Sequence, residues 1–243
     1  MSLLPALVGL LLTRAGAVEP THARAVYDVQ IAGAAAGTRT VAWTWMPVAE
    51  RRVITQHTRA TLLGKPLETR CTASISRRGS NVTCASAHGD DAWEVQAQGS
   101  EGRAWSVRVR DRGGDAPSAP VVTLTTVELF DAARVSAVLG RAEPGQAVSV
   151  LVAETGEVVT GTLAVPTAVE VRVGGQPRAA TRHELRASAG GLVVDVDADG
   201  ALLRAELRTA LGAMTLTAQA APPAREWGAL EGLELDGGVR EAP

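Results

Sequence analysis

The stretch from Asp195 to Glu206, "DVDADGALLRAE", is the part of the chain whose residue types and spacing come closest to a chemical site. It matches the D-x-D-x-D-G pattern of an EF-hand calcium loop, with a glutamate six residues after the glycine. In such a loop oxygen ligands surround the cation, and the last glutamate supplies both of its carboxylate oxygens. The pattern therefore makes Asp195, Asp197 and Asp199 candidate metal ligands.

The residues around this stretch favour a β-hairpin instead. The preceding "GGLVV" combines two glycines with β-branched residues, which makes it a poor end for a helix. Asp199-Gly200 is a strong signal for a two-residue hairpin turn, and that register places Asp195 opposite Arg204 on one face. The other face then pairs apolar residues: Val196 with Leu203, Val194 with Ala205, and Leu192 with Leu207.

The position of Glu206 decides between these two interpretations. On an extended strand it lies six residues beyond Gly200, roughly 20 Å away at about 3.3 Å per residue, so it cannot close a loop at the tip. The hairpin is therefore the preferred interpretation, and a weak cation site formed by the three aspartates is the alternative. No cofactor is expected.

The histidines do not form a recognisable catalytic motif. The four of them, His22, His57, His88 and His183, are far apart in the sequence. The chain contains no H-E-x-x-H, G-x-S-x-G or Walker pattern. A Ser-His-Asp site assembled from distant segments stays open as an alternative, because such triads are defined by geometry and not by order.

Trp43 and Trp45 are the candidate ligand-binding residues. They alternate within "TVAWTWM", which reads as a strand with Val41 and both tryptophans on one face. Such a face can line a ligand groove, or it can belong to the core of a sheet.

Cys71 and Cys84 are predicted to form a disulfide. They stand symmetrically about a turn at Arg77-Arg78-Gly79, so on a hairpin their side chains lie opposite each other on one face. Closing so short a loop adds roughly 3 kcal/mol of stability in the chain-entropy model. Disulfides persist in oxidising compartments, so the pair also favours an exported protein.

The elements that carry these residues are mostly strands, and the fold class is predicted to be mainly β. Alternating segments predict an antiparallel curved sheet, a sandwich or a partly open barrel. The loop-like residues 112–120 suggest two similar halves, 24–112 and 121–219. Residues 26–39 and 168–182 support this weakly, because both read as a strand, a glycine-containing turn and then Thr-Arg.

One short helix is expected over 127–139. Thr125 stands three residues before Glu128, which is the capping-box spacing, and Gly140 can end the helix. Leu129 and Val135 belong to a set of apolar residues at near-helical intervals.

The composition excludes several classes of function. The formal net charge is −2 and Lys65 is the only lysine, so a sequence-independent nucleic-acid surface is not expected. Hydrophobic residues make up 46% of the chain, which excludes wholesale disorder. Aromatic residues make up only 3%, so the core is expected to consist of small side chains, which suits sheets.

The first 17 residues look like a signal peptide. Residues 3–12 are apolar, and a small-x-small cleavage site ends at Ala17. A membrane span needs about 20 apolar residues, so no transmembrane segment is expected in the mature chain. Residues 18–219 are then one β-rich domain, and the Pro-, Gly- and acid-rich residues 220–243 are a partly disordered tail.

Two segments carry a resemblance to a known kind of domain. "YDVQIAGAAAGTRT" and the later "GQPRAATRHELRAS" with "GGLVVDVDADGALLRAEL" resemble bacterial exported β-rich domains of unknown function. Similar domains occur ahead of transglutaminase-like catalytic domains. The resemblance covers Arg24 to about Gln219, and it implies a β fold but no catalytic residue.

These observations favour an exported, periplasmic or secreted, non-catalytic binding or accessory protein of the cell envelope. Its ligand would be an apolar envelope component held in the concavity of the sheet, or its partner would be another protein. A secreted hydrolase with a dispersed active site is one alternative, and a purely structural envelope component is the other.

Overall fold

The structure is a computed structural model of the chain. It describes residues 21–46, 49–76, 79–99, 105–111, 122–124, 128–129, 144–188, 190–209 and 212–222. The predicted signal peptide, the predicted boundary loop and almost all of the predicted tail lie outside these residues.

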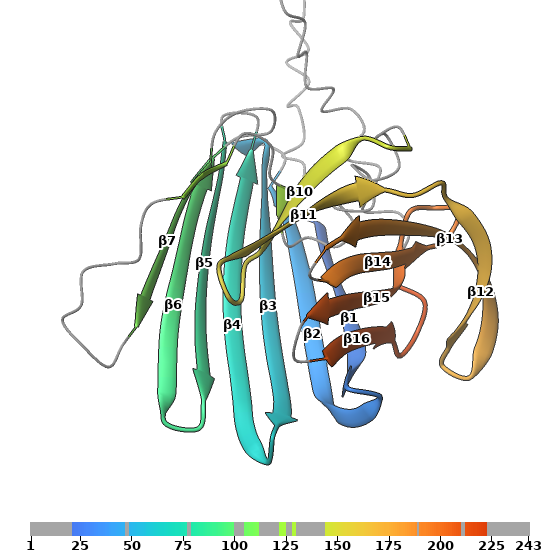
Figure 1. The fold of residues 1–243 in the computed structure, drawn as a ribbon, viewed down its shortest axis with the longest axis horizontal. Coiled ribbons are helices and arrows are strands. Elements are labelled where there is room, and N and C mark those ends of the chain that lie inside the picture. The colour runs from blue at the N-terminus through green and yellow to red at the C-terminus, as the bar shows by residue number, and fades with distance from the viewer. Residues whose placement is uncertain are drawn as a thin grey trace, which may run out of the picture.

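The described chain forms strands that are connected mainly by short turns (Figure 1). The first eight strands are β1 (Thr21–Ile31), β2 (Ala34–Met46), β3 (Arg51–Leu62), β4 (Lys65–Ser76), β5 (Gly79–His88), β6 (Asp91–Gly99), β7 (Trp105–Asp111) and β8 (Val122–Leu124). The others are β9 (Glu128–Leu129), β10 (Ala147–Val152), β11 (Glu157–Leu163), β12 (Thr167–Val173), β13 (Gln176–Ala187), β14 (Gly190–Val196), β15 (Leu202–Thr209) and β16 (Gly212–Ala218).

All sixteen strands belong to one sheet, in the order β8-β7-β6-β5-β4-β3-β2-β1-β16-β15-β14-β13-β11-β10-β9, with β12 paired to β13. Every pairing is antiparallel except that of β9 with β10. Among the described residues no pairing joins β8 to β9, so the curved sheet is an open barrel. This confirms the predicted fold class.

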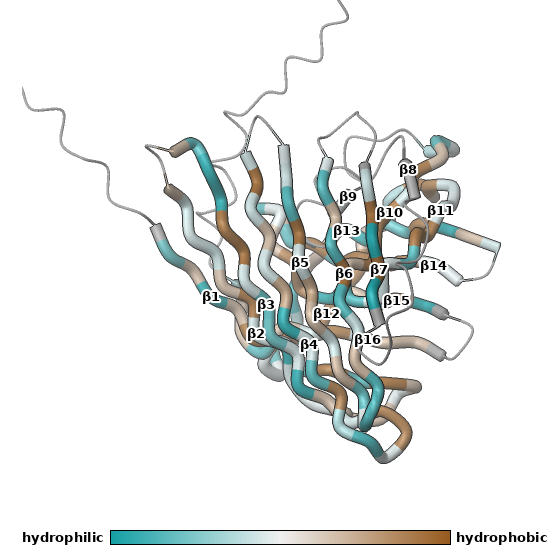
Figure 2. The backbone as a smooth tube through the Cα atoms, turned by 90° about the vertical axis from the view of Figure 1, so that its left-hand side faces the viewer, coloured by the Kyte–Doolittle hydropathy of each residue, from teal (hydrophilic) through white to brown (hydrophobic). Residues whose placement is uncertain are grey.

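The core lies on the inner face of this curved sheet. Along a strand, residues that point inward alternate with residues that point outward, so every second residue can contribute to this core. On β1, Ala25, Tyr27 and Val29 are buried, whereas Arg24 and Asp28 are exposed. The same alternation of apolar and polar residues is visible along the long strands in Figure 2. Small β-branched side chains suit such a half-buried pleated surface.

The hairpin of β14 and β15 confirms most of the predicted register. Asp195 is paired with Arg204, Val194 with Ala205, and Leu192 with Leu207, as expected.

The predicted tip of this hairpin is wrong by one residue. Gly200 donates its backbone N–H to the Asp197 carbonyl (3.1 Å), and Asp197 donates to the Ala201 carbonyl (3.0 Å), so the loop has three residues. Gly200 has a φ of +78°, the left-handed position that such a loop assigns to glycine. Val196 then pairs with Leu202 and not with Leu203, and a bulge restores the expected register from Asp195 onward.

The helix predicted over 127–139 is contradicted where the structure describes it. Glu128 and Leu129 form the short strand β9, which runs parallel to Val150 and Leu151 of β10. The other residues of the predicted helix lie outside the described residues. A backbone that completes the edge of a sheet gains hydrogen bonds to its neighbour, and this tertiary gain outweighs a weak local preference for helix.

The two predicted halves meet within one continuous sheet. Strand β1 of the first half pairs with β16 of the second half over five registered residues, from Tyr27 with Ala218 to Ile31 with Met214. The two segments that look like a repeat are both hairpins, β1–β2 and β12–β13. No helix in the described part of the chain is long and apolar enough to cross a membrane.

Candidate functional site

A row of polar side chains crosses the inner face of the sheet from β2 to β6. Direct cross-strand pairing connects its members in the order Arg39, Thr58, Thr69, Ser86 and Trp93. The first four are buried, with exposed fractions of 7%, 1%, 3% and 4%. Buried polar groups need hydrogen-bond partners, so this polar row on the inner face implies that another polar element packs against it.

The partner of this row is the tip of the β10–β11 hairpin, which crosses in front of the long strands in Figure 1. One carboxylate oxygen of Glu154, Oε1, lies 2.7 Å from Arg39 Nη2 and accepts a hydrogen bond from Gln56 Nε2 at 2.9 Å. The main-chain carbonyl of the same residue accepts hydrogen bonds from Trp93 Nε1 (2.7 Å) and Ser86 Oγ (3.2 Å). Four strands therefore hold a single residue of the hairpin.

The hairpin tip fits closely because it contains a glycine. Gly156 donates to the Val152 carbonyl (2.8 Å) and has a φ of +77°, which favours glycine. A Cβ at this position would lie 2.5 Å from Val109 Cγ2 and 3.5 Å from Val95 Cγ1. The tip therefore packs directly on β6 and β7.

The Arg39–Glu154 pair is shielded from water. The two side chains are 8% and 14% exposed, and Arg39 Nε also donates to Thr58 Oγ1 at 2.9 Å. Removing one partner of a buried ion pair costs about 3–5 kcal/mol because the other charge stays buried without compensation. The hairpin tip is therefore held by charge as well as by shape.

A cavity of about 80 Å³ lies beside this contact, between the hairpin and strands β14 to β16. Ten apolar side chains line it together with Arg39 and Glu154. Those that face each other from the hairpin and from the sheet include Val150, Val152, Val159, Val194, Leu207 and Leu216. The cavity is partly open to solvent, and its apolar lining has room for a short aliphatic chain.

Trp43 and Trp45, the predicted ligand-binding residues, do not line this cavity. Trp43 is 5% exposed and lies in the core, paired with Ile54 across β2 and β3. Trp45 is half-buried and pairs with Arg52. Arg39, on the same face of β2, lines the cavity, and a ligand-binding role for Trp43 and Trp45 stays a prediction.

The three aspartates of the predicted metal site are not gathered into one ligand set. Asp195 is 0% exposed and accepts two hydrogen bonds from Arg182, at 2.7 and 2.9 Å. Asp197 Oδ1 accepts from the backbone N–H groups of Asp199 and Ala201, at 3.0 and 2.8 Å, so it stabilises the turn. Within the described ranges, no cluster of three or more His, Cys, Asp or Glu residues could hold a metal ion.

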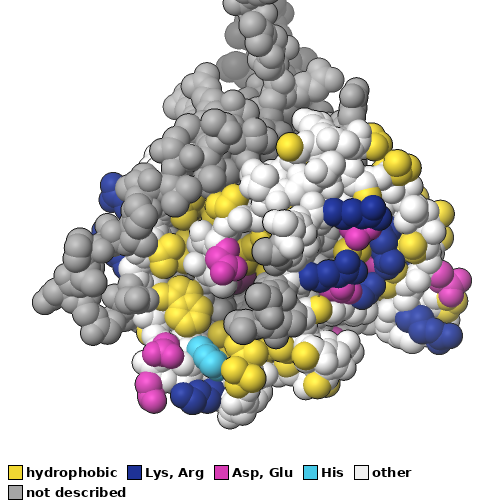
Figure 3. Space-filling view, in the orientation of Figure 1, with side chains coloured by type: hydrophobic (Ala, Val, Ile, Leu, Met, Phe, Trp, Pro, Cys, Tyr) yellow, Lys and Arg dark blue, Asp and Glu magenta, His cyan; other side chains and the backbone are white. Residues whose placement is uncertain are grey.

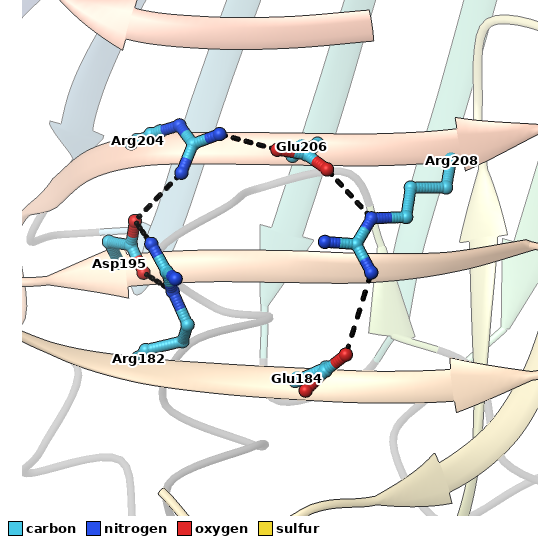
Figure 4. A network of polar contacts seen from close by, with 6 residues as sticks. All are labelled: Arg182, Glu184, Asp195, Arg204, Glu206 and Arg208. Atoms are coloured by element: carbon cyan, nitrogen blue, oxygen red, sulfur yellow. Dashed lines mark hydrogen bonds and ion pairs between the residues drawn. The ribbon is translucent and has the colours of Figure 1, made fainter. Parts of the chain in front are cut away.

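Asp195 belongs instead to a network of charges on the outer face of β13 to β15 (Figure 4). Arg204 lies 3.6 Å from Asp195 and also contacts Glu206, which Arg208 reaches at 2.7 Å. The hydrogen bond from Arg208 holds the pKa of Glu206 below its usual value. Figure 3 shows these charged side chains gathered in one patch over the three strands.

The histidines do not converge on the cavity. His57 contacts Glu68 at 2.8 Å among half-exposed side chains, and His88 Nε2 lies 2.9 Å from the Leu62 carbonyl. His183 is 6% exposed, its Nδ1 has no hydrogen-bond partner, and burial lowers its pKa. None of them lines the cavity.

Cys71 and Cys84 form the predicted disulfide. They are paired directly across β4 and β5 on the inner face, one row away from Thr69 and Ser86 of the polar row. The disulfide therefore ties β5, one of the strands that hold the hairpin tip, to its neighbour β4.

Comparison with known proteins supports the fold but gives no function. No family model matches the chain, and no curated protein matches it. A solved structure, the beta-barrel-like protein of domain of unknown function DUF1849 from Brucella abortus, is similar with a TM-score of 0.50 and 11% sequence identity. The match covers 82% of this chain and 95% of that one. The chain therefore has the fold of a β-rich domain of unknown function.

Proposed function

We propose that this protein is a non-catalytic binding protein of the cell envelope that holds an apolar ligand between the β10–β11 hairpin and the concave face of the sheet. The observation that carries this proposal is the apolar cavity of about 80 Å³ at that contact. Ligand sites in proteins are typically concave and mostly apolar, with a few polar groups that fix orientation. Arg39 and Glu154 are such groups here.

The chemistry of the cavity favours binding over catalysis. Its lining offers one ion pair among apolar side chains, and neither a histidine nor a hydroxyl side chain is part of it. A hydrolase site would need a nucleophile and a base within hydrogen-bond reach of each other. The proposal therefore takes a binding role as the function of this site.

Export is the second part of the proposal. The N-terminal residues 1–17 have the pattern of a signal peptide, and the Cys71–Cys84 disulfide suits an oxidising compartment. Expression in a bacterial host should yield a mature chain that begins after Ala17 in the periplasmic or secreted fraction, as measured by intact mass. A full-length chain that stays in the cytoplasm would contradict export. The resemblance to domains found ahead of transglutaminase-like catalytic domains stays a prediction.

The binding proposal is tested with butan-1-ol as the probe, because its short aliphatic chain suits the cavity with the hairpin tip in place, and binding is measured by ligand-detected NMR. Ala205 lines the cavity and is 8% exposed, so Ala205→Leu places extra methyl groups in the empty space. The variant should bind the probe at least about tenfold more weakly, because the added side chain takes the volume that the ligand needs.

The matched control is Ala179→Leu, which adds the same group at an exposed position on β13. Its probe binding should equal that of the wild type. Equal binding by all three proteins, or no binding by the wild type, would mean that the cavity is not the site.

A further inference from the structure

Arg39 places a positive charge at one end of the cavity. Its counter-ion, Glu154, comes from the hairpin on the other side. Arg39 lies on β2, in the middle of the continuous sheet, and is fixed by its hydrogen bond to Thr58. Glu154 lies on the hairpin tip, so the anion that neutralises Arg39 belongs to a separate element. Whatever displaces the hairpin tip must also replace that anion.

The hairpin has fewer registered backbone pairs with its neighbouring strands than the long strands have with one another. Strand β11 shares only two registered pairs with β13, Thr162 with Arg186 and Leu163 with Leu185. Strand β10 shares two with the described residues of β9. Strands β3 and β4, in contrast, share twelve, from Arg51 with Ser76 to Leu62 with Lys65. Segments with few backbone contacts open at lower free energy than the body of a sheet.

The cavity is also too small for a complete amphiphile while the tip is in place. At about 80 Å³ it has room for a few carbon atoms, whereas typical ligand pockets measure roughly 300–1,000 Å³. Lifting the tip would join the cavity to the polar row and expose Arg39. The space that becomes available is then apolar at one end and positively charged at the other.

We propose that the ligand is an aliphatic amphiphile with an anionic headgroup, and that its anion takes the place of the Glu154 carboxylate on Arg39. This inference rests on the proposed binding function and names the class of ligand. Glu154 acts as an internal competitor that closes the empty site. A neutral ligand that took the place of the tip would cover Arg39 without supplying an anion, and burial of an unpaired charge disfavours such a complex.

The experiment compares decanoate, decan-1-ol and decyltrimethylammonium, which share a ten-carbon chain, by isothermal titration calorimetry at submicellar concentrations. The wild type should bind decanoate at least about tenfold more tightly than decanol, because the carboxylate forms a charge-assisted pair with Arg39. It should bind the cationic amphiphile least. This ratio is read on the wild-type protein and needs no variant.

Glu154→Gln removes the competing charge and keeps the shape of the side chain. Its affinity for decanoate should rise about tenfold, and its affinity for decanol should rise as well, because neither ligand then has to break the Arg39–Glu154 pair. The matched control is Glu157→Gln, which removes the same charge from an exposed position on the same hairpin and should change neither. Arg39→Gln should reduce the decanoate affinity to that of decanol.

Equal affinities for decanoate and decanol in the wild type would overturn the anionic headgroup but leave the apolar binding function standing. An unchanged affinity for decanoate in Glu154→Gln would overturn the competition by Glu154. Failure of all three amphiphiles to bind would remove the proposed function itself.

Discussion

Asp195 shows how a single carboxylate can be fully buried at the outer face of this sheet. It is 0% exposed, and Arg182 and Arg204, which contact it, are 33% and 29% exposed. The carboxylate is therefore compensated by two guanidinium groups that still reach water. Such an arrangement specifies which strands lie side by side, because Asp195 comes from β14 and the two arginines come from its neighbours β13 and β15.

Asp195→Asn should destabilise the protein by about 2–3 kcal/mol. This is below the value of about 3–5 kcal/mol for a fully buried pair, because both arginines can turn towards water. Chemical denaturation measures the change. Glu184→Gln is the control, because its pairs with Arg186 and Arg208 are more exposed and should contribute less than about 1 kcal/mol. Equal losses in the two variants would contradict a special role for Asp195.

His183 should make the fold sensitive to mild acid. Burial lowers its pKa in the folded state below the value of about 6.5 expected for the unfolded chain. The unfolded chain therefore takes up the proton first, so this contribution to stability is complete above pH 6.5 and is lost as the pH falls towards the folded-state pKa. The melting temperature should fall between pH 7.5 and pH 5.5.

His183→Gln should reduce that fall, because the replacement does not titrate. The exposed residue His22 supplies the control, since His22→Gln should leave the pH dependence as it is in the wild type. An identical dependence in the wild type and in the His183 variant would show that this histidine is not the sensitive group.

Among the elements, the β10–β11 hairpin contributes most to the candidate site. Its tip fills the concave face, supplies the counter-ion of Arg39 and forms one wall of the cavity. Its position depends on Gly156, where both the backbone angle and the contact with Val109 require glycine.

Gly156→Ala should cost more stability than Gly200→Ala. Both residues have a φ near +77°, so both substitutions introduce backbone strain of about 1 kcal/mol. Only Gly156 would also place its Cβ against a side chain, since nothing lies within 4 Å of a Cβ at Gly200. The additional loss should be about 1–3 kcal/mol by denaturation, as for other overpacked sites. Equal losses would mean that the tip does not pack on β6 and β7.

At the scale of the whole molecule, one sheet connects both ends of the described chain. Strand β1 pairs with both β2 and β16, so it connects the first long strands to the later ones. The β10–β11 hairpin then lies across the inner face of those first strands. The inner face of the first seven strands is therefore covered partly by the second part of the chain. Such non-local pairings also make folding slow relative to helical proteins.

A fragment of residues 21–111 should not fold to a stable structure alone. It would expose the inner apolar face and the buried polar row without the hairpin that satisfies them. Far-ultraviolet circular dichroism and urea titration should show no cooperative transition for this fragment, and addition of residues 144–222 should restore one. A cooperative transition of the fragment alone would show that the two halves are independent domains.

The sequence by itself determined the local features of this protein. Alternation along the strands predicted a curved antiparallel sheet, the symmetry of Cys71 and Cys84 about a turn predicted their disulfide, and Asp195 was placed opposite Arg204. These features follow from periodicity and from pairing across a single hairpin, which are short-range properties of a chain. The tip at Gly200 was misplaced because a bulge can absorb one residue without changing the register farther along.

Only the tertiary structure decided the site. Arg39, Ser86 and Glu154 lie on three elements that are far apart in the sequence, and nothing local distinguishes them from other polar residues on strands. One signal lies in β4, where Thr69 shares the inward face with Cys71, Ala73 and Ile75 and is the polar residue among them. The physical reason is that the partner of a buried polar group is set by how the sheet curves, and that curvature brings the β10–β11 hairpin onto the row from across the molecule.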